Sequence, residues 1–236
     1  MLAQSNGKMF LAGTRGYSEQ NWFRSYNTFN FGTFQNEDKT PFGALYVLND
    51  DTLAGGRSLI QFIEEDTIVV LLPTVGTITY SDTAGHQTLI EAGQMQQHNL
   101  QKGTTFEIGN PYQDDLVHFI QIWIKGAVSP TFSIPQCTAF DLKQSENTLL
   151  SIIPAEQRVD SFNLCIGKFT GREEIAYHLS GPRNGVFVFV LQGAFEVQHR
   201  LLESRDGLAL WNTPQIEMEA LSNDAVVLLL EVPLVD

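Results

Sequence analysis

The sequence predicts an all-β protein built from two antiparallel β-barrels in tandem, each of the jelly-roll (double-stranded β-helix) type. Short runs rich in β-branched and aromatic residues alternate with turn residues along almost the whole chain. The alternation of strands with long helices that marks a parallel sheet is missing from the pattern. The second half of the chain also repeats the order of strands and turns found in the first half.

In the first half, each predicted strand ends at a cluster of Gly, Asn, Asp, Thr or Lys. The first strand is expected to stop at a turn formed by Asn49-Asp50-Asp51. The predicted strands of this half are Ala44–Leu48, Ser58–Ile63, Thr67–Leu72, Thr77–Ser81, Gln87–Ile90, Met95–Leu100, Thr104–Ile108 and Leu116–Ile124.

Past Gly126 the pattern changes, because residues 127–135 hold two prolines and little periodicity, which is typical of a linker. A second β-rich half follows, in which Glu173–His178 is the best candidate for a short helical turn. The predicted strands of this half are Ser161–Phe169, Gly185–Leu191, Ala194–His199, Gly207–Trp211, Ile216–Leu221 and Ala225–Val232.

The middles of the two halves match each other. In both, a buried strand leads to a glycine turn and an alternating strand, with the turn at Gly76 in the first half and Gly193 in the second. A Gly-led strand then follows, opening at Gly93 and at Gly207. Repetition of this kind indicates related units. We therefore expect an N-terminal domain over residues 1–126 and a C-terminal domain over residues 127–236.

Composition excludes several classes of function. Apolar residues make up 43% and charged residues 17% of the 236-residue chain, as in ordinary globular proteins. A net charge of −13, with only 14 Lys and Arg, disfavours nucleic acid and anionic membranes as partners. The sequence shows neither a signal peptide nor an apolar run long enough to span a bilayer, so we expect a cytoplasmic protein. Cys137 and Cys165 are expected to be buried, reduced thiols.

One spacing carries the chemical information in this chain. Gly56, Phe62, Glu64, Val69 and Gly76 fall on the G-x5-H-x-H-x3/4-E-x6-G pattern by which cupin barrels present metal ligands. Imidazole and carboxylate groups bind first-row metals by donating lone pairs at about 2 Å. A phenyl ring or an isopropyl group donates none. The spacing therefore indicates a metal-binding barrel, whereas the residues that occupy it indicate that the metal is absent.

Longer segments resemble the pirin family of bicupins, and in particular the bacterial pirin-like quercetinases. The resemblance covers nearly the whole chain and runs without a gap from Leu48 to Asn110. The segments that carry it are Arg15-Gly16, Trp22-Phe23-Arg24-Ser25-Tyr26-Asn27-Thr28-Phe29-Asn30-Phe31-Gly32, Val47-Leu48-Asn49-Asp50-Asp51, His118-Phe119-Ile120-Gln121-Ile122-Trp123-Ile124 and Asp206-Gly207-Leu208-Ala209-Leu210-Trp211.

This resemblance implies one iron or another divalent metal in the N-terminal barrel, held by a His-Pro-His pair and by a later histidine and glutamate. The first pair falls on Phe62 and Glu64 and the second on Phe106 and Ile108, while a histidine of the family's N-terminal segment is replaced by Asn27. Three of the four ligand positions thus carry hydrocarbon side chains. We therefore expect neither a metal nor another cofactor, and loss of the family's metal-dependent dioxygenase activity.

Two interpretations of these positions remain open. Residues two apart share one face of a strand, so Phe62, Glu64, Phe106 and Ile108 are all expected to point into the N-terminal barrel. They then either line a pocket for a small apolar or aromatic molecule or fill the former cavity as ordinary core. A buried Glu64 would need a partner, and the inward positions of Gln96 and His98 offer one.

The leading hypothesis is a non-catalytic small-molecule-binding or regulatory protein. One alternative is a metal-dependent oxygenase of the quercetin 2,3-dioxygenase type. Another is metal-free acid–base catalysis by Glu64 and His98. A rearranged metal site formed by Glu64, His98 and His118 is a further option. His86, His178 and His199 are expected to be surface or structural residues. The sequence predicts no particular protein partner and no oligomeric state.

Overall fold

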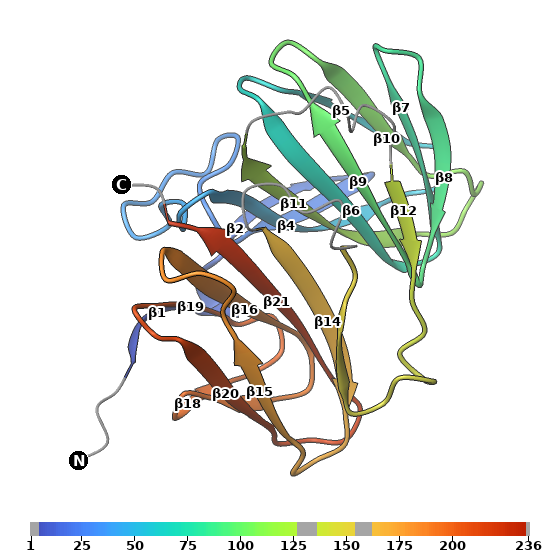
Figure 1. Ribbon diagram of the computed structural model, residues 1–236. Helices are drawn as coiled ribbons and strands as arrows, with labels where there is room; N and C mark the ends of the chain where they lie inside the picture. Colours follow the sequence, from blue (N-terminus) through green and yellow to red (C-terminus); the bar gives the residue numbers. More distant parts are fainter. Residues whose placement is uncertain (1–4, 127–135, 154–161, 235–236) are drawn as a thin grey trace. The chain divides into compact units, whose positions relative to one another are not determined.

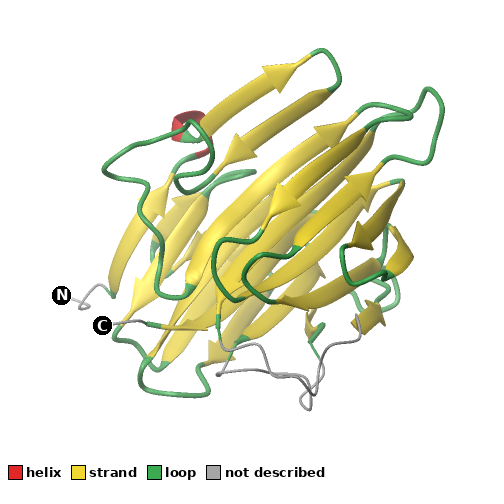
Figure 2. Cartoon of the chain, turned by 90° about the horizontal axis from the view of Figure 1, so that it is seen from above, coloured by secondary structure: helices red, strands yellow, loops and turns green. Residues whose placement is uncertain are grey.

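The computed structural model describes residues 5–126, 136–153 and 162–234, and antiparallel strands dominate it (Figures 1 and 2). The only helical element among these residues is a short 3₁₀ turn, η1 (Ala12–Thr14). In the same residues, no helix has the length and apolar character needed to cross a membrane. The all-β prediction is confirmed.

The chain forms two compact units, one made of residues 16–41 and 45–140 and the other of residues 1–15, 42–44 and 141–236. We call them the first and the second unit. They differ from a simple division after Gly126, because β12 (Gln136–Ala139) pairs with a strand of the first unit and β1 (Asn6–Phe10) with a strand of the second. The expected linker over residues 127–135 lies outside the described residues.

The first unit consists of a seven-stranded and a four-stranded antiparallel sheet. In spatial order the larger sheet contains β12, β9 (Gln94–Leu100), β6 (Thr67–Val75), β11 (Val117–Lys125), β4 (Leu45–Leu53), β3 (Phe23–Asn27) and β2 (Gly16–Gln20). The smaller sheet contains β5 (Ser58–Phe62), β10 (Thr105–Gly109), β7 (Thr77–Asp82) and β8 (Gln87–Glu91) (Figure 1).

The second unit consists of a six-stranded and a four-stranded antiparallel sheet. In spatial order the larger sheet contains β1, β19 (Gly207–Trp211), β16 (Asn184–Gln192), β21 (Ala225–Pro233), β14 (Asn163–Phe169) and β13 (Thr148–Ser151). The smaller sheet contains β15 (Glu174–His178), β20 (Gln215–Ala220), β17 (Phe195–Val197) and β18 (Arg200–Leu202).

The two units repeat one topology. The sheet order β9-β6-β11-β4 of the first unit recurs as β19-β16-β21-β14, and the order β5-β10-β7-β8 recurs as β15-β20-β17-β18. The turn glycines Gly76 and Gly193 also adopt similar left-handed φ values of 79° and 78°. Such φ values favour glycine, and a Cβ on Gly76 would also lie 2.9 Å from Cγ1 of Val117. The predicted tandem repeat is confirmed.

Two local predictions were wrong. The segment predicted to form a helical turn, Glu173–His178, is a strand over Glu174–His178 whose residues alternate in exposure. The Asn49-Asp50-Asp51 segment is not a turn, because β4 continues through it to Leu53. Pairing with β3 on one side and β11 on the other satisfies the backbone of this segment and outweighs its turn preference.

The space between the two sheets of each unit is filled by apolar side chains. In the first unit, odd-numbered residues of β4 and β11 point into this space, so that Val47, Leu53, Phe119 and Trp123 belong to one buried cluster. The second unit has a similar cluster, to which β16, β19 and β21 contribute. Because these strands are buried on both faces, they read in sequence as nearly continuous apolar runs.

Candidate functional site

Phe62 and Glu64 do not point into the N-terminal barrel. The Phe62 side chain is 56% exposed and Glu64 is also exposed, whereas Ile63 between them is fully buried in the core. The Ile63 N–H donates to the Thr104 carbonyl at 2.9 Å, which ties this residue to β10. Burying the isoleucine rather than a carboxylate avoids a large desolvation cost. The prediction that Phe62 and Glu64 face the interior was therefore wrong.

Phe106 and Ile108 do point inward, as parity along β10 predicted. They are 1% and 0% exposed, respectively. The Phe106 ring lies 5.7 Å from Tyr80 and 5.8 Å from Trp123, measured between ring centroids. Such distances are those of packed aromatic cores. These two positions therefore match the interpretation in which side chains fill the interior of the first unit as ordinary core.

His98 and Gln96 are buried on β9, with Gln96 accepting a 2.7 Å hydrogen bond from the Thr88 hydroxyl. The His98 ring stacks on Tyr80 at 3.6 Å between centroids. Burial lowers the pKa of His98 to about 3, so the imidazole is neutral at physiological pH. Neither ring nitrogen has a hydrogen-bond partner among the described residues. Because Glu64 is exposed on the outside, the predicted pairing of Glu64 with His98 or Gln96 is wrong.

The residues at the expected ligand positions do not fit a metal ion. Glu64 is the only one of the four with a lone-pair donor, and it faces solvent. His118 lies on the face of β11 opposite Phe119, where its Nδ1 is 3.0 Å from the Thr52 hydroxyl. In the described part of the chain, no three His, Cys, Asp or Glu side chains come together as a metal-binding group. The rearranged Glu64–His98–His118 site is therefore also wrong.

His86 has a structural role in a turn. Its Nδ1 lies 2.8 Å from Oδ2 of Asp82, and the same carboxylate oxygen accepts a hydrogen bond from the Tyr80 hydroxyl at 2.9 Å. Burial alone would raise the pKa of Asp82, but the hydrogen bonds from His86 and Tyr80 lower it overall. The Asp82 carboxylate therefore ties the β7–β8 turn to the barrel wall.

The large sheet of the first unit carries a buried polar band that sequence analysis did not predict. Its members lie on adjacent strands at inward-facing positions and are Ser25, Asn27, Asn49, Asp51 and Gln121. The Gln121 amide donates to Asp51 Oδ2, and Asn27 Nδ2 donates to the Ser25 hydroxyl at 2.9 Å. Both amide atoms of Asn49 and the second carboxylate oxygen of Asp51 lack partners in the described structure.

Asp51 is the one acidic residue of this band. Burial raises the pKa of its carboxyl group to about 7, although hydrogen bonds with Ser25 and Gln121 oppose the increase. The alternation of Asn49 and Asp51 across Asp50 was the sequence signal that could have revealed the band, because it has the period of a strand. The turn prediction for Asn49-Asp50-Asp51 took no account of this alternation.

The second unit also buries a carboxylate, Glu231, but satisfies it fully. Glu231 accepts hydrogen bonds from the Tyr177 hydroxyl at 2.6 Å, from the Ser180 N–H and hydroxyl at 2.8 and 2.7 Å, and from Asn184 Nδ2. Such a satisfied carboxylate anchors the segment between β15 and β16. Because its carboxylate oxygens are occupied by these donors, we interpret Glu231 as a structural residue.

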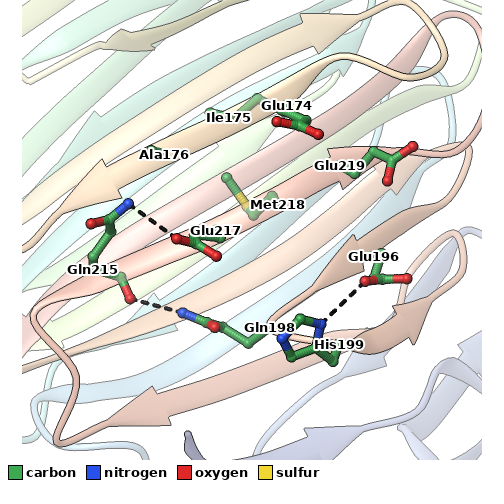
Figure 3. Close-up of a pocket in the computed structure, with 10 residues that line it drawn as sticks. All are labelled: Glu174, Ile175, Ala176, Glu196, Gln198, His199, Gln215, Glu217, Met218 and Glu219. Atoms are coloured by element: carbon green, nitrogen blue, oxygen red, sulfur yellow. Dashed lines mark hydrogen bonds and ion pairs between the residues drawn. The ribbon is translucent and has the colours of Figure 1, made fainter. Parts of the chain in front are cut away.

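A hollow of about 440 Å³ lies on the solvent-facing side of the smaller sheet of the second unit (Figure 3). Glu174, Glu196, Glu217 and Glu219 give it an acidic lining. Its polar groups contact one another or neighbouring side chains: His199 Nδ1 lies 3.5 Å from Glu196, and Gln198 donates to the Gln215 carbonyl at 2.8 Å, while Arg172 pairs with Glu219 at 3.1 Å. We interpret it as a solvated acidic surface.

The two cysteines are free thiols, as expected, but only Cys165 is buried, whereas Cys137 is exposed. The Asn163 amide nitrogen lies 3.3 Å from Cys165 Sγ. Although Cys137 is exposed, partial desolvation of its thiol raises the pKa, which disfavours the reactive thiolate. Neither thiol therefore has the environment of a reactive cysteine.

Comparison with known proteins adds family information to this geometry. The family model described as Pirin matches residues 11–124, and the model described as Quercetinase C-terminal cupin domain matches residues 159–232. The chain is 25% identical over 231 residues to a protein of Escherichia coli K12 named quercetin 2,3-dioxygenase, covering 94% of this chain and 96% of that one. A putative quercetin 2,3-dioxygenase of Pasteurella multocida is also 25% identical, covering 88% of this chain and 91% of its own.

Solved structures share the fold. The crystal structure of YhhW from Escherichia coli matches with a TM-score of 0.86 and 22% identity, covering 98% of this chain and 99% of that one. A crystal structure described as bacterial pirin YhhW in complex with nickel(II) matches with a TM-score of 0.85, also at 22% identity, covering 98% of this chain and all of the other. The two-unit architecture is thus that of a known bacterial protein.

Proposed function

Because this chain belongs to the pirin family of quercetinase-type bicupins, we propose that it is a member which has lost metal-dependent catalysis and acts as a non-catalytic binding or regulatory protein. The observation that carries the proposal is the orientation of β5. Phe62 at the end of β5 and Glu64 in the bend that follows, which occupy the first pair of ligand positions, both lie away from the interior of the first unit.

Chemistry at the remaining positions supports this proposal. Phe106 and Ile108 supply no lone pair and lie within the packed core. A relative is described in complex with nickel(II), and others are named quercetin 2,3-dioxygenases. Metal-assisted oxygenation needs a metal held by several donors with positions left open for substrate and oxygen. The donor set of this chain does not meet that requirement.

The packing of the first unit also bears on the kind of binding, which is either small-molecule binding in the interior or contact with other proteins. The rings of Tyr80, His98, Phe106 and Trp123 lie close together where a small apolar or aromatic molecule would have to fit. Filling a barrel in this way leaves the outer surface as the place for recognition. We therefore favour a regulatory role through protein contacts over small-molecule binding in the barrel.

The proposal predicts that the protein neither retains a transition metal nor opens the flavonol ring. The test is elemental analysis of protein purified without chelator, calorimetric titration with Ni²⁺ and Fe²⁺, and oxygen uptake with quercetin. The Escherichia coli quercetin 2,3-dioxygenase serves as the positive control. Stoichiometric metal, or quercetin turnover above the enzyme-free rate, would show that the proposal is wrong and would favour the dioxygenase alternative.

A further inference from the structure

Strand β5 forms an exposed apolar edge of the first unit. It is the last strand of its sheet, and no described strand pairs with its other side (Figure 1). The side chains of Ile60 and Phe62 are 67% and 56% exposed and lie on the outer face. Natural proteins usually protect such an edge with Lys, Pro or a β-bulge. Ser58–Phe62 contains neither Lys nor Pro, and its pairing with β10 shows no register shift.

The hydrogen-bond pattern leaves the backbone of the same residues available. The Ile63 N–H donates to the Thr104 carbonyl, and the Ile63 carbonyl accepts from the Gly103 N–H at 2.8 Å. At the other end of the strand, the Arg57 carbonyl accepts from the Asn110 N–H. In an antiparallel pair alternate residues bond to the neighbouring strand, so the odd-numbered residues of β5 face β10. The N–H and C=O groups of Ser58, Ile60 and Phe62 therefore point to the open edge.

The charges around this edge are mainly acidic, with Arg57 just before the strand as the exception. Glu64, Glu65 and Asp66 follow the strand and are exposed, and Glu107 lies opposite Ile60 on β10. Lys125 neutralises Glu65 at 2.8 Å. Glu64 and Glu107 have no ion-pair partner within the described residues. A partner that docks here thus meets apolar side chains, free backbone groups and negative charge together.

We propose that the β5 edge is a docking site for an extended segment of a basic partner protein, which adds to the sheet as a further strand. Main-chain hydrogen bonds to Ser58, Ile60 and Phe62 would give the affinity. Apolar side chains of the partner would cover Ile60 and Phe62, and its Lys or Arg residues would approach Glu64 and Glu107. This inference names a class of partner for the proposed binding role. Docking at the β5 edge depends on that role only for its biological purpose.

Charge decides against a second copy of this chain as the occupant. Each copy carries a net charge of −13, and pairing two β5 edges would bring two such charges together. The opposite edge of the sheet, β8, is a weaker candidate. Leu89 is the only large apolar residue of β8 that is strongly exposed, and β8 is already attached to β9 through the hydrogen bond between Thr88 and Gln96.

The test uses the full chain and a fluorescent peptide that alternates valine and lysine, with no metal or flavonol present, so that it can fail independently of the proposed function. Two comparison peptides alternate valine and glutamate, or carry N-methyl groups on alternate amides of the valine–lysine peptide. Anisotropy is expected to show binding of the first peptide and affinities weaker by roughly tenfold or more for the other two. Amide exchange at Ser58, Ile60 and Phe62 should slow when the first peptide is bound.

The matched variants are Ile60→Lys and Leu89→Lys, which place the same charge on the two opposite edges of one sheet. Ile60→Lys should weaken peptide binding by roughly tenfold, and Leu89→Lys should change it by less than about twofold. Equal effects of the two variants, equal binding of the N-methylated peptide, or no binding to the wild-type protein would overturn the proposal. Self-association of the wild-type protein that Ile60→Lys abolishes would also overturn it, by making a second copy the occupant.

Discussion

Several fully buried side chains of this protein are polar, unlike the apolar side chains that make up most of its core. Asp51 and Glu231 are both fully buried, yet their surroundings differ. Glu231 accepts hydrogen bonds on both carboxylate oxygens, whereas one oxygen of Asp51 has no partner among the described residues. An unpaired buried charge is costly, and protonation is the simplest way to reduce that cost. Asp51 is therefore one residue through which pH acts on the stability of the first unit.

The pH prediction follows from the direction of that pKa change. Folding raises the pKa of Asp51 to about 7, so the folded state binds this proton more tightly than the unfolded state. Its contribution to stability is present at low pH and is lost as pH rises from about 4 to about 7. Asp51→Asn removes the titrating group. The unfolding free energy of this variant, relative to that of the wild type, should therefore rise by up to roughly 4 kcal/mol between about pH 4 and about pH 7.

Chemical denaturation of wild type and Asp51→Asn between pH 4 and pH 8 measures this difference. Taking the difference between the two proteins cancels the titration of the other acidic residues. A carbon NMR titration of the Asp51 carboxyl group provides an independent check. A difference in unfolding free energy that does not change with pH would show that Asp51 is ionised in the folded protein throughout.

At the scale of elements, the face that β5 presents decides the chemistry of the first unit. The strand buries Leu59 partly and exposes Ile60 and Phe62, and Ile63, the residue just after it, is fully buried. A shift of one residue moves every side chain of a strand to the other face. Because Ile63 is held inside by its hydrogen bond to the Thr104 carbonyl, the first pair of positions expected to carry metal ligands, Phe62 and Glu64, lies outside.

Restoring the family's ligands should therefore fail to restore a metal site. The variant Phe62→His, Glu64→His, Phe106→His, Ile108→Glu places two of its four donors on the outer face, too far apart from the others to share one ion. A matched variant with Gln61→His and Ile63→His in place of the first two changes keeps the number of donors and directs all of them inward. Nickel titration should show tighter binding to the second variant.

Circular dichroism of both variants is needed to check that they remain folded, because each introduces polar groups into the core at Phe106 and Ile108. The comparison depends only on which face of β5 carries the histidines. Nickel binding to the first variant that is as tight as to the second would mean that β5 can turn its even-numbered residues inward. That result would contradict the outward orientation of Phe62 and Glu64.

At the scale of the whole molecule, each repeat is completed by a segment distant in sequence. The second unit includes residues 1–15 and 42–44 as well as the C-terminal half of the chain. Strand β1 pairs with β19 along its full length, and the rings of Phe10 and Phe42 lie 5.4 and 6.2 Å from Phe187. A C-terminal half on its own would leave β19 as an uncovered edge.

A fragment of residues 127–236 should therefore melt at a lower temperature than the second unit of the intact chain and should aggregate more readily. A synthetic peptide of residues 1–15 should raise its melting temperature, because a ligand that binds only the folded state stabilises it. The control peptide carries Phe10→Lys and should have a smaller effect. Equal melting with and without the native peptide would show that β1 adds nothing to the stability of this unit.

The sequence by itself determined the all-β class, the positions of most strands and the tandem repeat. These features depend on local periodicity and on turn residues such as Gly76 and Gly193, which act over short stretches of chain. It also predicted that the ligand positions hold no complete donor set, because the resemblance places the hydrocarbon side chains of Phe106 and Ile108 at two of them. The resemblance to pirins, carried by segments near both ends, was confirmed by the family models.

Only the tertiary structure decided which face of β5 is buried, that Asn49 and Asp51 lie inside the barrel, and that β1 belongs to the second unit. Each of these depends on pairing between strands that are distant in sequence. The local pattern at β5 fits either face, since Ile60, Phe62 and Ile63 are all apolar, and the turn preference of Asn49-Asp50-Asp51 is real but weak. Backbone pairing with β10, β3 and β11 supplies the larger free energy and therefore sets the outcome.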